Sequence, residues 1–474
     1  MLHRHTWPAA RSIWREGSFG GSALGNIAGG RAGANVVDAD KTETERSLRA
    51  RVPIEQRPAI LWTFPRYGHV LAPERRCVLG RGEHCEGRFD GTKISREHAE
   101  LSPVGSALGV RDLNSRNGVW VNGQRVEAAA LVHGDVLRLG EWVGCVVPGL
   151  TEDTQFGEIA PGLWGGPRMA AALAPARKLA EKSIPLVIQG ATGTGKERVA
   201  RALHAWSGRS GEYVGVNCAA IPSDLAEAEL FGHTKGAFTG AERARPGFFR
   251  QADQGTLLLD EFLELAPRTQ AKLLRVLEEN EVQPIGDNRA YPIDVLLLAA
   301  TQQGLHEVVE AGQLRNDLVA RLGVYTLRLP RLAERKEDVA PLFMHFVREF
   351  TESAQPEVEA ELIEWLCLQP WGQNVRELEW LARAMTALHD DAGCLMIEHL
   401  PPQYQEGPPP APSPSAPPPS MLEDSELFLR LKHALDANGG VVLRAAEELG
   451  ITRQKAYRIL EKHSVELEEL RRRR

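Results

Sequence analysis

The chain has 474 residues, a formal net charge of −7 and a pI near 6.1. This length predicts about two to four domains, and the acidic balance excludes a protein that coats nucleic acid along its whole length, so any such contact must come from a local basic patch. The six cysteines are scattered without a C-x-x-C pair, which argues against a disulfide scaffold or a zinc site and favours the reducing cytoplasm.

Residues 1–54 hold arginines among many Gly, Ala and Ser residues, and no apolar h-region precedes a cleavage site. We predict a disordered extension there, and an overlong start site is the alternative. Along the chain no apolar run approaches the roughly 18 residues of a membrane span, so no membrane partner is expected.

Residues 55–148 alternate short β-type runs with the turn residues Gly, Asn and Asp. The runs lie at 60–62, 76–79, 118–121, 136–139 and 143–147. Many short strands separated by turn signals predict an all-β sandwich.

Polar motifs recur between these runs in a fixed order. They are Gly80-Arg81, Ser95-Arg96-Glu97-His98, Asp112 to Gly118, and Val121-Asn122-Gly123. A guanidinium and a hydroxyl are the donors that phospho-motif readers present to a phosphate group. In order and spacing, the segment resembles a forkhead-associated (FHA) domain.

That resemblance implies a partner, either a phosphothreonine-containing protein or a Ser/Thr kinase. The residues that it assigns to phosphopeptide binding are Arg81, Ser95, Arg96 and Asn117. His98 is expected to brace the site from within. The alternative is an FHA fold that no longer binds phosphopeptides.

After a linker at 149–162, buried-strand runs alternate with helical stretches over residues 163–330. The apolar runs lie at 184–188, 256–259 and 295–299. Such alternation predicts an α/β unit in which helices cover a parallel sheet.

A glycine-rich segment follows the first of these runs directly. It contains Gly190, Gly193, Thr194, Gly195, Lys196 and Glu197. Glycines let backbone N–H groups turn onto phosphate oxygens, and the next helix adds its positive end. Because strand, loop and helix in this order form the context of a P-loop, ATP is the predicted cofactor, with Lys196 reaching its β- and γ-phosphates.

Two carboxylates, Asp260 and Glu261, end the second apolar run. Ligands bind at the carboxyl edge of open α/β sheets, so both side chains should face the nucleotide. We expect Asp260 to hold Mg²⁺ and Glu261 to orient or activate the attacking water.

A short loop between these motifs has glycines near both ends. It reads Gly236, Ala237, Phe238, Thr239, Gly240 and Ala241. The glycines permit sharp turns that would present Phe238 and Thr239 at the tip, and an exposed aromatic side chain indicates a protein partner. An ordinary glycine hairpin with Phe238 in the core is the alternative.

The order and spacing of the P-loop, this loop and the carboxylate pair resemble the AAA+ activators of sigma-54 RNA polymerase over residues 160–465. The resemblance implies that the loop at 236–241 contacts the sigma-54 RNA polymerase holoenzyme. It also implies an α-helical lid at 331–400 and a homo-oligomer that assembles from dimers into a hexameric ring.

The same resemblance assigns further roles around the nucleotide. Asn217 is the switch residue that restrains Glu261, Thr301 is the first sensor, and Arg376 on the lid contacts phosphate. Arg315 and Arg321 are the arginines that a neighbouring subunit supplies to stabilise the transferring phosphoryl group.

Residues 401–421 are rich in proline, which predicts a stiff, extended linker. The segment at 422–465 shows an apolar stripe at helical spacing, Gly450 at a turn and Thr452 as an N-cap. It resembles an all-α, Fis-type helix-turn-helix, which implies binding to double-stranded DNA upstream of promoters; a plain helical hairpin is the alternative. The residues expected to face DNA are Arg453, Gln454, Lys455, Tyr457 and Arg458. A charged tail at 466–474 ends the chain.

Together these segments predict a cytoplasmic sigma-54-dependent transcription activator. Its ATP hydrolysis would remodel closed promoter complexes under the control of phosphothreonine binding. Two alternatives stay open: an AAA+ remodeller of another protein, and a phosphopeptide-dependent DNA-binding regulator with weak or no ATPase.

Overall fold

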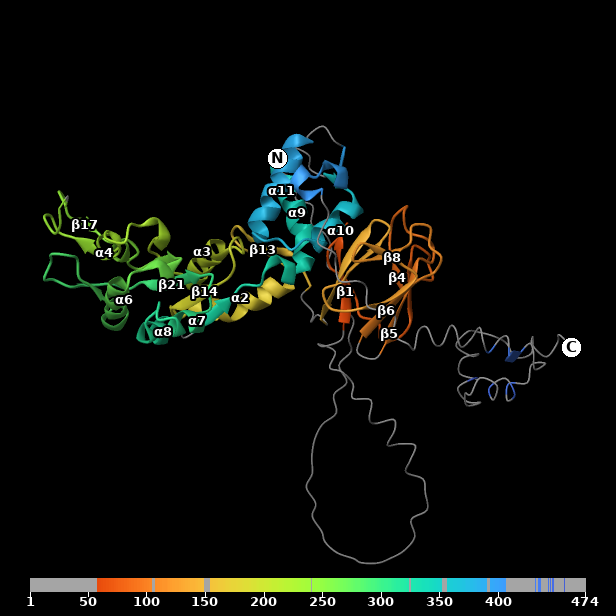
Figure 1. Cartoon of the computed structure of the whole chain (residues 1–474), viewed down its shortest axis with the longest axis horizontal. Coiled ribbons are helices and arrows are strands. Elements are labelled where there is room, and N and C mark those ends of the chain that lie inside the picture. Colours follow the sequence, from red (N-terminus) through yellow and green to blue (C-terminus); the bar gives the residue numbers. More distant parts are fainter. Residues whose placement is uncertain are drawn as a thin grey trace, which may run out of the picture. The chain divides into compact units, whose positions relative to one another are not determined.

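The computed structural model describes residues 58–104, 107–148, 154–239, 241–323, 325–351, 356–389 and 393–405, and the single residues 431, 434, 435, 442, 444, 446 and 456. Along the chain, the elements form a β-sandwich, an α/β unit and a helical lid (Figure 1). The predicted extension at 1–54, the predicted DNA-facing residues 453–455, 457 and 458, Gly240 and the tail at 466–474 lie outside the described residues. Within the described ranges, no helix is long and apolar enough to cross a bilayer.

Two sheets form the β-sandwich. The first has the order β2-β1-β11-β10-β7-β8, with β1 (Pro58–Phe64), β2 (His69–Leu71), β7 (Val119–Val121), β8 (Gln124–Val126), β10 (Val136–Leu139) and β11 (Trp142–Pro148). The second has the order β4-β3-β5-β6-β9, with β3 (Cys77–Gly80), β4 (Gly87–Arg88), β5 (Ala99–Val104), β6 (Ala107–Asp112) and β9 (Ala128–Leu131). A core that includes Trp62, Leu101 and Leu137 fills the space between them.

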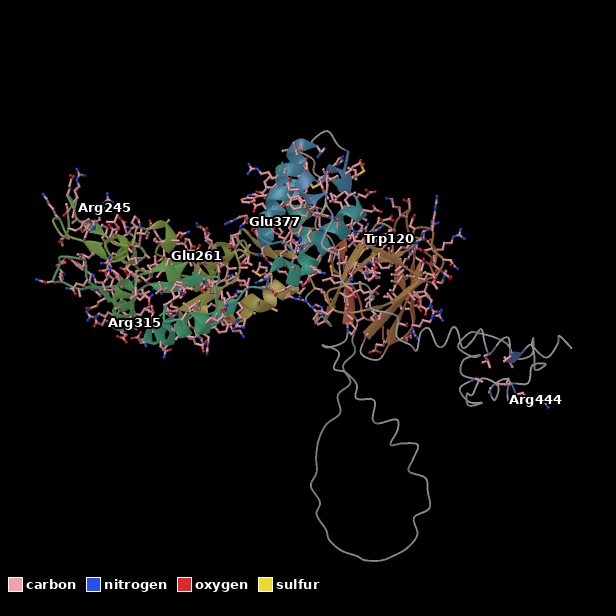
Figure 2. The ribbon with its side chains drawn as sticks, viewed as in Figure 1. Trp120, Arg245, Glu261, Arg315, Glu377 and Arg444 are labelled. Carbon is pink, nitrogen blue, oxygen red and sulfur yellow. The ribbon has the colours of Figure 1, made fainter. Side chains whose placement is uncertain are left out.

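The α/β unit is built on a five-stranded parallel sheet of order β15-β18-β21-β14-β22. Its strands are β14 (Leu186–Gln189), β15 (Tyr213–Asn217), β18 (Thr256–Asp260), β21 (Leu296–Thr301) and β22 (Thr326–Arg328). Strand β18 ends at Asp260, so Glu261 follows at the carboxyl edge of the sheet (Figure 2). The predicted parallel sheet is therefore present, and its strands are apolar on both faces because both faces are covered.

Helices cover the two faces of this sheet in separate clusters. One cluster packs α2 (Pro167–Ala180) and α3 (Lys196–Ser207) against Ile188, Leu258 and Leu298. The other packs α4 (Ala226–Phe231), α5 (Phe248–Gln251), α6 (Pro267–Glu279), α7 (Leu305–Glu310) and α8 (Asn316–Leu322) against Val187, Leu257 and Leu297. The 3₁₀ turns η2 (Cys218–Ala220) and η3 (Phe262–Glu264) follow β15 and β18. Short pairs complete the unit: β16 (Gly232–His233) with β17 (Arg245–Pro246), and β19 (Glu281–Val282) with β20 (Tyr291–Pro292).

The lid consists of three helices and short connecting elements. They are η4 (Leu332–Glu334), η5 (Lys336–Asp338), α9 (Val339–Phe350), β23 (Glu357–Val358), α10 (Ala360–Leu368), α11 (Asn374–Leu388), β24 (Cys394–Leu395), η6 (Ile397–His399) and η7 (Pro402–Tyr404). Two segments predicted as linkers carry structure: 149–162 contains β12 (Gly157–Ala160), which pairs with β13 (Leu163–Gly165), and 401–421 begins with η7.

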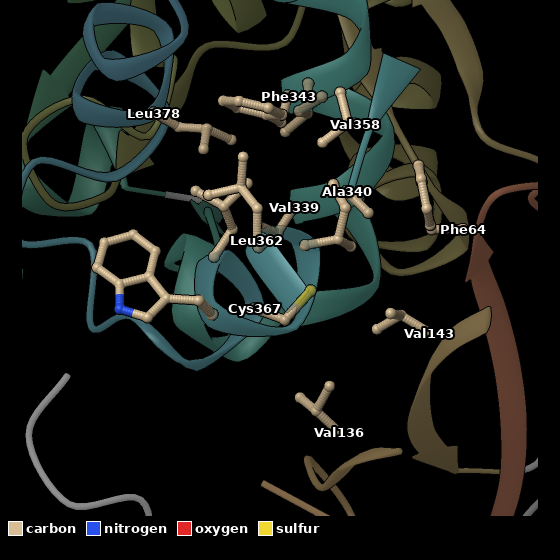
Figure 3. Close-up of a cluster of buried hydrophobic side chains, with 14 of the residues drawn as sticks. Phe64, Val136, Val143, Val339, Ala340, Phe343, Val358, Leu362, Cys367 and Leu378 are labelled. Atoms are coloured by element: carbon tan, nitrogen blue, oxygen red, sulfur yellow. The ribbon is translucent and has the colours of Figure 1, made fainter. Parts of the chain in front are cut away.

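One hydrophobic core spans the sandwich and the lid. Alternate residues of β1 point to opposite sides, so Ile60 and Trp62 enter the sandwich core while Ala59 and Leu61 join the lid cluster. Figure 3 shows Val136 and Val143 of the sandwich beside Cys367 of α10. The first sheet is therefore buried on both faces, and the lid covers the face that a free sandwich would expose to water.

Polar contacts accompany this apolar interface. Arg138 of β10 is almost fully buried and places its Nε 2.6 Å from Glu364 and its Nη1 2.9 Å from Glu361, both on α10. The backbone N–H of Gly123 also donates to Glu364, at 2.9 Å. Lys336 donates to the Gly134 carbonyl at 2.8 Å. Burial of one arginine between two carboxylates fixes the register of sandwich against lid, because an unpaired charge in that place would cost several kcal/mol, on the order of 3–5.

Candidate functional site

The P-loop connects β14 to α3 through two glycines with left-handed backbones. Gly193 has φ +75° and Gly195 has φ +100°, which side-chain-bearing residues rarely adopt. A Cβ on Gly193 would lie 1.9 Å from the carbonyl oxygen of Gln373 in the lid. Glycine is thus needed at 193 both for its backbone angle and for the close approach of the lid.

Lys196 begins α3 and reaches back across the loop. It is 8% exposed, its Nζ donates to the Gly190 carbonyl at 3.1 Å, and it lies 3.9 Å from the Glu261 carboxylate. Burial raises the pKa of Asp260, and the Lys196 ammonium opposes that rise. The Lys196 ammonium therefore stands between the loop and the carboxylates, in a position to meet a phosphate chain.

Glu261 is held in an uncommon conformation. Its φ is +52°, in the left-handed region that a non-glycine residue occupies only at a cost. Gln302 donates from Nε2 to its carboxylate at 2.8 Å, and Thr192 donates to the Gln302 side chain at 2.8 Å. This chain of contacts connects the P-loop to the carboxylate that was predicted to act on water.

A cavity of about 340 Å³ opens beside these groups. It is lined by nine of the predicted residues: Gly193, Thr194, Gly195, Lys196, Glu197, Asn217, Asp260, Glu261 and Arg376. Its volume falls within the range of small-molecule sites. The structure therefore brings the predicted phosphate, metal and lid residues to one place.

The lining of the cavity also includes a group of mostly apolar residues that was not found from the sequence. The group is formed by Leu163, Trp164, Met169, Leu342, His345 and Phe346. The rings of Trp164 and His345 lie 4.4 Å apart between centroids. Aromatic and aliphatic side chains in the same cavity as the P-loop suit a nucleotide, whose flat base is apolar and whose phosphates are charged.

Four other predicted residues, Gly190, Thr301, Arg315 and Arg321, lie beyond the lining of this cavity. Thr301 is buried, and its carbonyl accepts a hydrogen bond from the P-loop N–H of Gly190 at 3.0 Å. Arg315 is exposed and pairs with Asp317 at 2.7 Å (Figure 2). Arg321 is exposed beside the Leu277 carbonyl. Asn217 does line the cavity, but its side-chain oxygen accepts from the N–H of Ala219.

The loop from Gly236 to Ala241 folds back on itself. The Gly236 N–H donates to the Ala241 carbonyl at 2.8 Å, with φ +81° at Gly236. Phe238 is 36% exposed and sets its ring edge-to-face against His233, 5.0 Å between centroids. Thr239 is exposed. Phe238 thus rests on a neighbouring ring rather than in the core.

The predicted phosphopeptide residues gather on the loops at one end of the sandwich. The N–H of Arg81 donates to the Ser95 carbonyl at 3.0 Å, and the Ser95 Oγ accepts from the N–H of Arg116 at 3.0 Å. The carboxamide of Asn117 donates to the Lys93 carbonyl at 2.6 Å. The side chains of Arg81 and Arg96 are exposed, so two guanidinium groups are free to meet a phosphate.

His98 is buried beneath these loops. Its Nδ1 accepts from the N–H of Ser95 at 3.1 Å, so its Nε2 carries the proton and donates to the Gly118 carbonyl at 3.0 Å. Burial lowers the pKa of this imidazole. A neutral His98 therefore braces the Ser95 loop against the strand that follows Asn117.

Acidification is expected to destabilise the protein partly through His98. The unfolded chain protonates histidine near pH 6.5, whereas folded His98 has a lower pKa; stability is therefore full above about pH 6.5 and is lost as the pH falls toward the folded pKa. Urea midpoints measured from about pH 7.5 to 5.5 should fall more steeply for the wild type than for His98→Gln. Because the remaining histidines are common to both proteins, equal slopes would contradict this role of His98.

The protein families that match this chain divide it into the same parts as the fold. Residues 77–140 match the FHA domain, residues 165–328 the Sigma-54 interaction domain, and residues 333–417 the AAA+ ATPase lid domain. The transcriptional regulatory protein ZraR of Salmonella typhi is 40% identical over 305 residues, which are 63% of this chain and 67% of ZraR. The C4-dicarboxylate transport transcriptional regulatory protein DctD of Rhizobium meliloti is 38% identical over 295 residues, 61% of each protein. NtrX from Brucella abortus in complex with ATP has a TM-score of 0.47 at 29% identity, covering 64% of this chain and 70% of NtrX.

The P-loop, the carboxylate pair and the matched lid define an ATPase of the AAA+ class. The chain belongs to the family of sigma-54-dependent transcriptional regulators, and an FHA domain precedes its Sigma-54 interaction domain.

Proposed function

We propose that the chain is a transcription activator that uses ATP hydrolysis to open promoter complexes of sigma-54 RNA polymerase. The observation that carries this proposal is the pairing of a nucleotide cavity with an exposed loop on one α/β unit. Lys196, Asp260 and Glu261 line the cavity, while Phe238 and Thr239 present a partly apolar tip to a protein partner.

Each residue of the cavity has a defined part in hydrolysis. Lys196 binds the β- and γ-phosphates, and Glu261, held by Gln302, orients water for attack on the γ-phosphorus. Asp260 would hold Mg²⁺, which neutralises charge on the phosphates when bound. The donor set fits, because Mg²⁺ in nucleotide sites takes one or two carboxylates and completes its shell with phosphate and water oxygens.

Arg315 and Arg321 support assembly into a ring. Both are exposed and lie outside the cavity lining of their own subunit. If these two guanidinium groups stabilise a transferring phosphoryl group, they do so in the cavity of a neighbouring subunit. We place these arginines at the subunit interface of a homo-oligomer, the hexamer of the sequence-based prediction.

The FHA domain regulates the ATPase, and the C-terminal segment binds DNA. The FHA domain binds a phosphothreonine protein through Arg81, Ser95, Arg96 and Asn117 and thereby sets ATPase activity in the cytoplasm. The segment at 422–465 binds upstream DNA as a helix-turn-helix. In support, Leu431, Leu435, Val442, Ala446 and Ala456 are helical and buried, whereas Arg444 is exposed (Figure 2).

Replacing Thr239 with alanine is expected to separate hydrolysis from promoter opening. The loop lies outside the cavity, so ATP turnover should stay close to wild type, whereas loss of a central contact should lower open-complex formation about tenfold or more. The measurement is ATP turnover and open-complex yield with sigma-54 holoenzyme and promoter DNA, using Glu242→Gln as an exposed control beside the loop.

The same assay decides between the alternatives. Turnover that rises with a phosphothreonine peptide library supports gating by the FHA domain. Hydrolysis without any promoter opening would favour a remodeller of another protein. No turnover at any protein concentration, with DNA present to promote assembly, would favour a DNA-binding regulator without ATPase.

A further inference from the structure

Lys93 connects the phosphopeptide end of the sandwich to the lid. It lies two residues before Ser95, and its carbonyl accepts the hydrogen bond from the Asn117 carboxamide. Its Nζ lies 3.6 Å from the carboxylate of Glu359, the residue that precedes α10 as its N-cap. One residue therefore touches the predicted peptide-binding Asn117 through its backbone and the lid through its side chain.

A second set of contacts leads from Asn117 to the same helix. The Asn117 carbonyl accepts from the indole N–H of Trp120 at 3.0 Å, and the Arg138 guanidinium lies 4.6 Å from the centre of that indole ring. Arg138 in turn pairs with Glu361 and Glu364 on α10. Both ends of Asn117 are thus tied to the first two turns of α10.

The lid carries this connection to the nucleotide. Helices α10 and α11 both pack against α9 in the shared core, and α11 presents Arg376 to the cavity. The lid also touches the P-loop directly: Asn374 donates to the Thr192 carbonyl at 2.8 Å, and the N–H of Val375 donates to the Gly193 carbonyl at 3.1 Å. A displacement at the start of α10 therefore has a packed route to the phosphate-binding loop.

The Lys93–Glu359 pair differs from the Arg138 contacts in its exposure. The side chains of Lys93 and Glu359 are 53% and 29% exposed, whereas Arg138 and Glu364 are almost fully buried. An exposed lysine with a flexible stem can change partners without unfolding its surroundings. Glu359 also stands close to Glu361, and after burial this second carboxylate is the next cause that raises the pKa of Glu359. Lys93 is thus the cation that relieves a crowded acidic edge of the lid.

We propose that Glu359 of the lid and the phosphate of a bound phosphothreonine compete for Lys93, so that phosphopeptide binding loosens the contact between the FHA domain and the start of α10. The inference rests on the proposed phosphopeptide function and names its route to the ATPase. A phosphate carries nearly two negative charges and three acceptor oxygens, so it attracts the ammonium more strongly than one carboxylate does. Because coupling between two binding events is reciprocal, a lid that releases Lys93 raises the affinity for phosphopeptide.

Phosphopeptide affinity of the full-length chain tests this competition. The probe is a fluorescent phosphothreonine peptide library, measured by anisotropy. Glu359→Gln should tighten binding about two- to fivefold, the value of a partly exposed ion pair. The same substitution in a Lys93→Gln background should have no effect, because the competed cation is gone. Glu357→Gln, an exposed carboxylate on the neighbouring strand β23, is the matched control and should behave as wild type.

The outcomes separate the two levels of the proposal. If the wild type binds phosphothreonine peptides and Glu359→Gln binds them with unchanged affinity, the competition is wrong and the FHA function stands. If Glu359→Gln also raises phosphopeptide affinity in the Lys93→Gln background, the competition is wrong, because the effect does not depend on Lys93. If the phosphothreonine library gives no more signal than the unphosphorylated library with any of these proteins, the phosphopeptide function fails and the inference fails with it.

Discussion

Replacing Glu261 with glutamine is expected to lower ATP turnover by about 10²–10⁴-fold while nucleotide still binds. Glutamine keeps the shape of the side chain and leaves Lys196 and the P-loop glycines in place, but it cannot accept a proton from water. Phosphate release measures turnover, and titration with a fluorescent nucleotide measures binding. The Glu261 carboxylate lines the cavity at the carboxyl edge of the sheet. Its replacement should therefore lower the rate of hydrolysis and leave nucleotide affinity unchanged.

Glu264→Gln is the control for that experiment. Glu264 is an exposed carboxylate three residues further along, in η3, and it does not line the cavity. Its replacement should leave turnover unchanged. If Glu261→Gln lost nucleotide binding and turnover together, Glu261 would be holding the nucleotide and not the attacking water.

Replacing Arg138 with methionine is expected to cost about 3–5 kcal/mol of unfolding free energy. Methionine fills much of the same space but leaves the buried Glu364 carboxylate without its cationic partner and Glu361 without its 2.9 Å contact. Urea denaturation of the full-length chain measures the loss. The effect should exceed that of any single exposed ion pair, which contributes about 0–1 kcal/mol.

A second substitution tests whether the uncompensated charge is the cause. Combining Arg138→Met with Glu364→Leu should restore much of the lost stability, because two apolar side chains of suitable size can replace a buried ion pair. If Arg138→Met alone were as stable as the wild type, water would have to reach Glu364, and the interface would be looser than the contacts indicate.

The nucleotide site could be predicted largely from the sequence because its parts are local. The P-loop and the carboxylate pair are each specified by a few contiguous residues, and a parallel sheet brings strand ends to one edge whatever the loops between them do. Lys196, Asp260 and Glu261 therefore meet in one cavity as expected. The apolar part of the lining could not be read in this way, since Trp164 and His345 come from β13 and α9 and have no spacing that distinguishes them from core residues.

The contact that holds Glu261 also depends on tertiary structure. Gln302 follows β21 and Glu261 follows β18, and these strands are neighbours only in the folded sheet. The sequence-based prediction gave the restraint to Asn217, which lines the cavity but whose side-chain oxygen caps the turn at Ala219. That Asn217 restrains Glu261 stays a prediction for another state of the cycle.

The strands at the interface between sandwich and lid have a distinctive pattern of apolar residues in the sequence. A strand with one solvent face alternates apolar and polar residues, whereas a strand buried on both faces is continuously apolar. Residues 59–62 and 142–147 are of the second kind, and Arg138 is a lone charge in a third apolar run. Such strands in an antiparallel sandwich indicate a second packing partner, although they do not identify it.

The doubly buried sheet bears on how such proteins diversify. A receptor module that meets its motor through a flexible tether can be exchanged for another, because nothing in the motor depends on its outer surface. Here Val136, Val143 and Cys145 belong to the same core as the lid helices. A foreign FHA domain would bring a polar outer face to that core and disrupt the packing of the lid, whereas substitutions in the loops around Ser95 and Asn117 would leave the shared core intact.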